Sequence, residues 1–550
     1  MATGRSALLL ALAAALLLAP SLIVGNLPSH SSPQNLTWAT QFADQFRAGI
    51  LYPRWLPDSY EGLGGSAFYF YPPIAFWVDA LLSVATFDAL PVPYRLSLAS
   101  LLLLWASGIA MQAWLRAEAA SPLTAFYGAL AYMAAPYHLL DHYYRGAYAE
   151  FAAYAVLPLV AVSVRQIAER RRFGPVWLAC AYAALPMAHL PTALLISVTA
   201  LPMYVLYRGW RLGAAKLAAV FFARCALSGA LGLGLAAIYL VPALGLQDWI
   251  PADMFWVDFY RVESWFFLTP GRWPPPIDMM LIIVSFAAAY GIAAIGVLVV
   301  LAQSGRARWW RSEAAFWAFV CIVCLLLIAG VLPWFWQMPF VAKVQFPWRL
   351  MIVVEFAAIT ALCLAPWPAR SRATSYIFIA AIIALGPGVG GMGSGIRFRV
   401  ETALAQQDSP QDLNQFMPAG FPRKPDWGYA DLGLEPLEGV PTIACVPQPR
   451  LCRTTDQRFG ELGIEIDADV PTVVVLRRFF FPFWRLDPPL PLVATDPLRL
   501  ISFTAPAGRH VYRLQHAAVG AEKIGWAISG LSLVLLLAWA AAAKRGIRFA

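Results

Sequence analysis

The chain has 550 residues, of which 60% are hydrophobic and 13% are charged. Soluble domains usually carry a charged share of roughly 25%, so the composition excludes an ordinary soluble protein. Apolar runs of about 20 residues recur along the chain, and each is long enough to cross roughly 30 Å of hydrocarbon. The formal charge of +9 comes from short Lys and Arg clusters between these runs, which is the positive-inside pattern of membrane proteins. It does not indicate a nucleic-acid partner.

The first span and the loop after it stand apart from the rest of the chain. Residues 5–25 are apolar after a single Arg and lack a convincing cleavage site, so we expect an uncleaved first span with a cytoplasmic N-terminus. The long loop 26–93 follows and is crowded with Trp, Tyr and Phe, which settle at membrane–water interfaces. Residues 34–50 have the spacing of an interfacial amphipathic helix. Residues 73–87 are apolar but short, and they contain Asp79.

Charge decides whether residues 73–87 cross the membrane. If they do not cross, about twelve spans place both termini and every basic cluster in the cytoplasm. If they do cross, each of these clusters lies outside. We therefore expect residues 73–87 to be half-embedded in the outer face. The basic clusters in question are RQIAERRRFG, RGWRLGAAK, SGRARWWRSE, PARSRA and KRGIR.

The sequence predicts three regions. Residues 1–390 form a helical membrane domain, residues 391–522 are polar and outside the membrane, and residues 523–550 hold a last span and a cytoplasmic tail. β-branched and alternating runs at 472–481 and 498–506 indicate that the polar region is mostly β-structure. The predicted fold class is thus an α-helical polytopic membrane protein with a C-terminal extracytoplasmic β-rich domain.

Two of the seven cysteines differ from the others. Cys445 and Cys452 flank a short Pro-containing loop in the polar region. Because that region is expected outside the cytoplasm, we predict a disulfide between them. Cys321 and Cys324 form a CxxC inside an apolar run, where cysteine is usually a small apolar core residue.

The second outer loop, PYHLLDHYYRGAYAE, carries several ionisable residues. His138 and His142 are four positions apart, a spacing that puts both rings on one helix face and could ligate a divalent cation. The alternative is a pair of hydrogen-bonded interfacial histidines. Asp141 lies between them and would line the same pocket.

Arg145 and Glu150 sit in the same loop, at the mouth of a span. Ionisable residues at membrane depth are costly, so they mark function or pair with each other. Since Gly146 permits a turn between them, we expect Glu150 to reach Arg145 and to face away from lipid. The pair is either catalytic or a structural anchor.

Other candidates lie in the first loop and in a late span. His30 and Asp44 belong to the first loop, where a carboxylate could deprotonate an acceptor hydroxyl. The alternative is a solvated loop acid. Arg349 enters a span from the outside in VQFPWR, and its fork could hold a phosphate; it could instead anchor the interface beside Trp348.

Several motifs in their order resemble a known family. They are LYPRW, which contains Arg54, then FYFYPP, PYHLLDHYYRGAYAE, VQFPWR and FFFPFW. Together they resemble the bacterial 6-pyruvoyl-tetrahydropterin synthase-related membrane proteins, which are similar in layout to the C-type glycosyltransferase superfamily and to YfhO-like membrane proteins. The zinc-binding histidine triad of a pterin synthase is missing, so we expect no pterin chemistry.

The resemblance to C-type glycosyltransferases implies a polyprenyl-phosphate-linked sugar as donor and an acceptor at the outer face. It also implies a catalytic acid after the first span, where this chain reads GNLPSH with Asn26 and His30. The base is then expected from Asp44, Asp58, Asp141 or Glu150. Substrate contacts are expected from His30, Arg54, His138, His142, Arg145 and Arg349.

Two functions remain open from the sequence. The first is a membrane glycosyltransferase of the bacterial inner membrane, with both termini cytoplasmic, that transfers a sugar from a polyprenyl phosphate to an extracytoplasmic glycan or protein. The second is a non-catalytic envelope protein that binds or moves a lipid-linked glycan. The absence of an acid in GNLPSH favours the second, whereas the layout of the loops favours the first.

Overall fold

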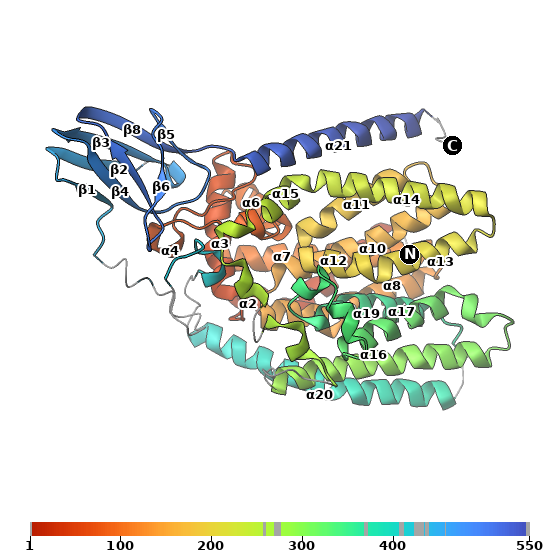
Figure 1. Cartoon of the computed structure of the whole chain (residues 1–550). Helices are drawn as coiled ribbons and strands as arrows, with labels where there is room; N and C mark the ends of the chain where they lie inside the picture. The colour runs from red at the N-terminus through yellow and green to blue at the C-terminus, as the bar shows by residue number, and fades with distance from the viewer. Residues whose placement is uncertain are drawn as a thin grey trace.

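A computed structural model describes most of the chain. The described residues are 3–256, 260–268, 277–367, 372–405, 412–422, 434, 439–456 and 458–545. They form a bundle of long, roughly parallel helices with two small β-sheets at one end (Figure 1). The N-terminus and the end of α21 (Gly520–Lys544) lie towards the other end of the bundle (Figure 1).

Within the described residues, eight helical segments are long and apolar enough to cross a membrane. Apolar runs form helices there because lipid offers the backbone no hydrogen-bond partners. The segments are α7 (Val92–Ala117), α10 (Tyr148–Ala168), α12 with α13 (Leu190–Val198 and Ala200–Arg211), α14 (Ala215–Leu235), α16 (Ile277–Gln303), η8 with α19 (Pro347–Leu350 and Met351–Leu364), α20 (Arg372–Ala405) and α21. Four apolar helices are shorter: α1 (Thr3–Leu17), α6 (Ile74–Ala85), α11 (Gly174–Ala188) and α17 (Glu313–Ile328). The predicted fold class, a polytopic helical membrane protein with C-terminal β-structure, is confirmed.

Two helices of the first loop lie at the end of the bundle nearest the sheets (Figure 1). They are α3 (Ser32–Arg47) and α6, which pack against each other and against α7. A buried ion pair of 2.9 Å between Asp79 of α6 and Arg95 of α7 fixes this packing. With 12 residues, α6 rises about 18 Å. That residues 73–87 do not cross the membrane stays a prediction.

The β-structure consists of two four-stranded antiparallel sheets. One has the order β1-β4-β7-β6 and the other β2-β3-β8-β5. The strands are β1 (Ile443–Val446), β2 (Leu451–Asp456), β3 (Leu462–Ala468), β4 (Thr472–Phe479), β5 (Trp484–Asp487), β6 (Val493–Ala494), β7 (Leu500–Ala505) and β8 (Gly508–His516). Their apolar side chains alternate with polar ones, as in β3, so that each sheet buries one face.

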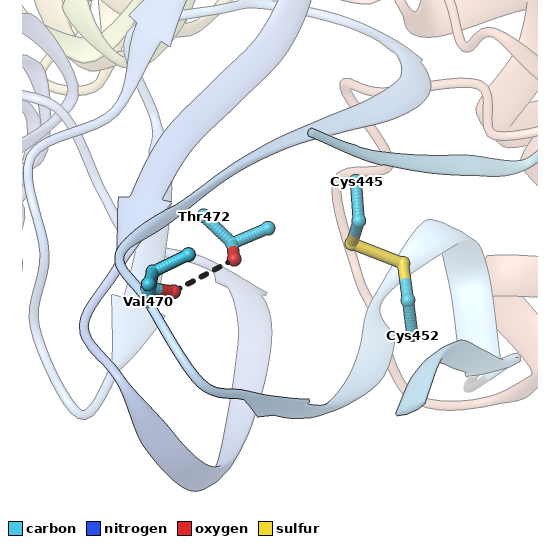
Figure 2. Close-up of a disulfide and its surroundings, with 4 residues drawn as sticks. All are labelled: Cys445, Cys452, Val470 and Thr472. Atoms are coloured by element: carbon cyan, nitrogen blue, oxygen red, sulfur yellow. Dashed lines mark hydrogen bonds between the residues drawn. A yellow bond between two sulfur atoms is a disulfide. The ribbon is translucent and has the colours of Figure 1, made fainter. Parts of the chain in front are cut away.

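The predicted disulfide between Cys445 and Cys452 is present. Cys445 belongs to β1 and Cys452 to β2, so the bond joins the edge strands of the two sheets (Figure 2). Nearby, the Thr472 hydroxyl donates to the Val470 carbonyl at the start of β4, at a distance of 2.9 Å (Figure 2).

The polar region differs in extent from the prediction. Helix α20 continues to Ala405, past residue 390, and the first described strand begins at Ile443. Residues 391–405 were predicted to belong to the polar region outside the membrane domain. The helix continues there with an ion pair of 2.9 Å between Arg397 and Glu401, one turn apart.

Aromatic side chains join the sheets to the first loop. The Trp55 ring lies 5.0 Å from the Phe483 ring and 5.7 Å from the Trp484 ring, both of the FFFPFW motif. The Phe479 amide donates to the Leu63 carbonyl at 2.8 Å. The first loop is therefore held between the membrane helices and the sheets.

Candidate functional site

The loop PYHLLDHYYRGAYAE carries a group of buried charges beneath the first loop. After α9 (Pro136–Leu140) the chain forms one wide turn, η1 (Asp141–Arg145), with i→i+5 hydrogen bonds. Such π-helical turns are frequent at functional sites. Gly146 ends the turn in the left-handed conformation, with φ of 62°, and α10 begins two residues later.

Arg145 is the centre of this group. Its Nη1 donates to Glu150 Oε2 at 2.7 Å, to the Tyr137 hydroxyl at 3.0 Å, and to Asp141. The guanidinium also lies 4.5 Å from the centre of the Trp348 ring. The prediction that Glu150 pairs with Arg145 and faces away from lipid is confirmed, because the Glu150 side chain is fully buried.

A second arginine completes the group. Arg349 Nε lies 3.5 Å from Glu150 Oε2, and its Nη2 donates to Gln345 at 3.2 Å. Two buried atoms of the group, Arg349 Nε and Asp141 Oδ2, have no hydrogen-bond partner. We call Tyr137, Asp141, Arg145, Glu150 and Arg349 the Arg145 cluster.

The electrostatics of the cluster favour an anion. Burial raises the pKa of Asp141 well above its usual range, and the nearby Glu150 raises it further, although Arg145 acts against this shift. Two guanidinium groups, those of Arg145 and Arg349, lie beside the Glu150 carboxylate. Paired arginines suit the oxygens of a phosphate.

The first loop closes over this group. The amides of His30 and Ser31 donate to the carbonyls of Tyr144 and Arg145, both at 3.0 Å. Gly146 is required for this approach, because a Cβ there would lie 2.3 Å from the Ser29 hydroxyl. The His30 side chain is exposed beside the cluster.

The two histidines of the second loop are engaged separately. The His138 ring stacks on Tyr154 with centroids 3.7 Å apart, and His142 Nε2 lies 2.8 Å from the Ser21 hydroxyl. Burial lowers the pKa of His138 to about 3 and that of His142 to about 4. Among the described residues, no group of three or more His, Cys, Asp or Glu side chains is placed to hold a metal ion.

Two predicted site residues lie away from the cluster. Asp44 pairs with Arg47, and it lies about 18 Å along α3 from Ser32, which is next to Gly146. Arg54 pairs with Glu522 of α21 at 3.2 Å. The structure therefore brings His30, Asp141, Arg145, Glu150 and Arg349 together, with His138 and His142 in the same loop, and separates Asp44 and Arg54 from them.

Glu355 was not among the site residues predicted from the sequence. Its fully buried carboxyl group accepts from the Tyr137 and His138 amides at 2.8 and 3.3 Å. It also accepts from the Tyr154 and Tyr290 hydroxyls at 2.8 and 3.3 Å. A lone acid in the apolar run MIVVEFAAITALCL was the available signal, since ionisable residues inside spans tend to be functional or paired.

The apolar helices indicate a multi-pass membrane protein, and comparisons with known proteins add no family to that class. No family model matches the sequence. No curated protein matches it either. The resemblance to 6-pyruvoyl-tetrahydropterin synthase-related membrane proteins thus gains no support from a family model.

Among solved structures, the chain is similar to two cryo-EM structures of the arabinofuranosyltransferase AftD from Mycobacteria. The sequence identities are 18% and 17%, and the TM-scores are 0.44 and 0.43. The matches cover 70% and 69% of this chain but only 28% of each AftD chain. A similarity at these TM-scores assigns neither a fold family nor an activity.

Proposed function

We propose that the protein is a membrane glycosyltransferase that takes a sugar from a polyprenyl-phosphate donor and transfers it to an acceptor at the outer face of the membrane. The observation that carries the proposal is the Arg145 cluster, in which two buried arginines and two acids lie beneath the first loop. The positive-inside pattern favours a bacterial inner membrane protein with both termini cytoplasmic and the sheets outside.

The cluster supplies the groups that such a transfer needs. Arg145 and Arg349 would hold the phosphate of the donor and stabilise the charge that develops on it as it leaves. Glu150 would accept the proton of the acceptor hydroxyl. The acceptor oxygen then forms a bond to the anomeric carbon, the bond from that carbon to the phosphate oxygen breaks, and polyprenyl phosphate leaves.

One observation favours a second function, the binding or movement of a lipid-linked glycan without reaction. The position after the first span where C-type enzymes have an acid is occupied by Asn26. Its side chain accepts from the Tyr148 hydroxyl and donates to Ser32 at 2.6 Å. These contacts give Asn26 a structural role that needs no chemistry.

An assay with purified protein separates the two functions. The wild type is incubated with radiolabelled polyprenyl-phosphate sugars and an envelope glycan fraction, and both donor binding and transfer are measured. Glycosyl transfer supports the enzyme, and it should be lost in Glu150→Gln, whereas the control Glu401→Gln changes an exposed acid of α20 and should keep it. Donor binding without transfer supports the second function, and neither binding nor transfer contradicts both.

A further inference from the structure

A cavity of about 280 Å³ lies where the first loop, α15 (Ala237–Gly245), the end of β8 and the start of α21 meet. It is separate from the Arg145 cluster, and its volume is near the lower end of small-molecule sites. Aromatic rings and a few polar groups line it, among them Tyr52, Arg54, Trp55, Tyr69, His516 and Trp526.

Four lining residues carry a buried polar atom without a hydrogen-bond partner. These atoms are Tyr52 Oη, Arg54 Nη1, Trp55 Nε1 and His516 Nε2. The side chains of Arg54 and Trp55 are themselves more than nine-tenths buried. Buried polar groups are rarely left unpaired, because each costs free energy. Four such atoms around one cavity therefore point to a ligand that supplies several oxygen atoms.

The charge of the cavity is balanced. Arg54 Nε lies 3.2 Å from Glu522 Oε1, and Arg54 Nη2 donates to the Ile238 carbonyl at 2.7 Å. The guanidinium also rests 4.1 Å from the centre of the Tyr52 ring. An anionic group would have to compete with Glu522 for Arg54, so the cavity favours an uncharged ligand over a phosphate.

We propose that this cavity binds an uncharged sugar unit of a glycan. The oxygens of sugar hydroxyls can accept from the unpaired N–H groups of Arg54 and Trp55, and a hydroxyl can also donate to or accept from Tyr52 Oη and His516 Nε2. The apolar faces of a sugar ring can pack against the aromatic side chains of the wall. Trp526 is 45% exposed and offers such a face at the rim.

The first loop borders both the cavity and the Arg145 cluster. Tyr69 of this loop lines the cavity, and the amides of His30 and Ser31 donate to the carbonyls of Tyr144 and Arg145. A role of the cavity as an acceptor subsite rests on the proposed transfer function, but the binding of a sugar does not.

The test is the binding of simple glycosides to the purified full-length protein. The probes are methyl α-D-mannopyranoside, methyl β-D-glucopyranoside and methyl α-D-arabinofuranoside, titrated to tens of millimolar while thermal stability is followed. We expect at least one probe to raise the melting temperature of the wild type in a saturable manner. In Tyr52→Phe the affinity for that probe should fall about three- to tenfold, since one hydrogen bond is lost.

The ligand-free stability of Tyr52→Phe gives a second readout. Because the hydroxyl that it removes is buried and unpaired, the melting temperature without sugar should be unchanged or higher. Tyr182→Phe is the matched control: its hydroxyl bonds Ser197 at 2.7 Å in the helical bundle, so stability should fall while sugar affinity stays the same. Trp526→Ala, at an exposed position, should weaken binding without unfolding the protein.

Three results would overturn the proposal. They are the absence of a shift with every glycoside, equal affinities in the wild type, Tyr52→Phe and Trp526→Ala, or a shift with glycerophosphocholine that the glycosides do not produce. The last result would assign the cavity to a lipid headgroup. The binding assay requires no glycosyl transfer. A failure of the sugar-binding proposal is therefore distinguishable from a failure of the glycosyltransferase proposal.

Discussion

The Glu355 carboxyl group accepts a hydrogen bond of 2.8 Å from the amide of Tyr137. Glu355 lies in α19 and Tyr137 in the first turn of α9, so the contact satisfies an amide that the helix itself leaves unpaired. Tyr137 in turn donates from its hydroxyl to Glu150 at 2.6 Å. Glu355 thereby holds the residue that positions Glu150.

We predict that Glu355→Gln lowers the free energy of unfolding by roughly 1–3 kcal/mol, because a carboxamide offers only one oxygen to the four donors. Thermal unfolding in detergent or nanodiscs measures the change. Glu401→Gln, at a side chain that is 60% exposed, is the control and should leave stability unchanged. Equal stability of Glu355→Gln and the wild type would contradict the supporting role.

The ion pair of Arg145 and Glu150 allows a double-mutant test. Arg145→Met leaves Asp141 and Glu150 buried without their shared partner, and we expect a loss of roughly 3–5 kcal/mol of stability. Adding Glu150→Gln should recover part of this loss, since a neutral pair leaves less unpaired charge. Chemical denaturation of the four proteins gives the coupling free energy. Additive effects would show that the two side chains do not interact.

The sequence was sufficient to predict this pair but not its surroundings. The cost of charges in a membrane and the turn at Gly146 indicated that Arg145 and Glu150 meet. Glu355, however, draws its donors from α9, α10 and α16, and contacts between distant helices leave no local pattern. For the same reason, the pairing of Arg54 with Glu522 could not be predicted.

Two residues of the first loop can lie at very different distances from the second loop. His30 and Asp44 belong to the same loop, yet α3 carries Asp44 away from the second loop while the amide of His30 bonds Tyr144. By contrast, the apolar character of helices such as α7, α10 and α16 and the disulfide of Cys445 and Cys452 followed from the sequence. The eight long apolar helices of the described residues are fewer than the about twelve spans that the sequence predicted. Hydrophobic runs and cysteine spacing are local signals, whereas the direction of a helix inside a loop depends on its packing.

The membrane topology can be tested with single cysteines in a variant that lacks the native free thiols. Ser121 lies exposed in the turn between α7 and α8 (Pro122–Met133), and we predict that Ser121→Cys reacts only from the cytoplasm. Asp469→Cys, between β3 and β4 at a side chain that is 67% exposed, should react only from outside. Ser163, which the same scheme also places near the cytoplasm, is buried in α10 and cannot serve as a reporter.

A membrane-impermeant maleimide added to whole cells and to inverted vesicles distinguishes the two sides. Labelling of Ser121→Cys in whole cells would mean that residues 73–87 cross the membrane. The loop assignments in the proposed function would then be wrong, because the Arg145 cluster would face the cytoplasm.

The disulfide should stabilise the sheets rather than the helical bundle. Closing a loop as short as that between Cys445 and Cys452 restricts the unfolded chain by about 2 kcal/mol. Changing both cysteines to alanine should therefore increase hydrogen exchange in β1 and β2 and leave the exchange of α10 unchanged. Equal exchange in β1 and β2 with and without the bond would show that strand pairing alone holds these edges.

The pH dependence of stability tests the buried histidines of the second loop. Burial holds the pKa of His142 at about 4 and that of His138 at about 3, whereas an unfolded histidine has a pKa near 6.5. As the pH falls from 6.5 towards 4, the unfolded chain binds protons that the folded protein does not. Stability must therefore fall with pH in this window, by about 1.4 kcal/mol per pH unit for each histidine well below pH 6.5.

Other groups contribute to the same curve, so variants are needed to isolate the histidines. Asp141 acts in the opposite direction, because its raised pKa gives stability that is lost as the pH rises. We predict that His142→Gln, which keeps a polar group near Ser21, makes the slope between pH 6 and 4.5 shallower by one bound proton. In the double variant, His142→Gln with His138→Gln, the slope should be shallower by two bound protons. Melting temperatures measured across this range give the slopes, and an unchanged slope in the double variant would show that neither ring is kept neutral by the fold.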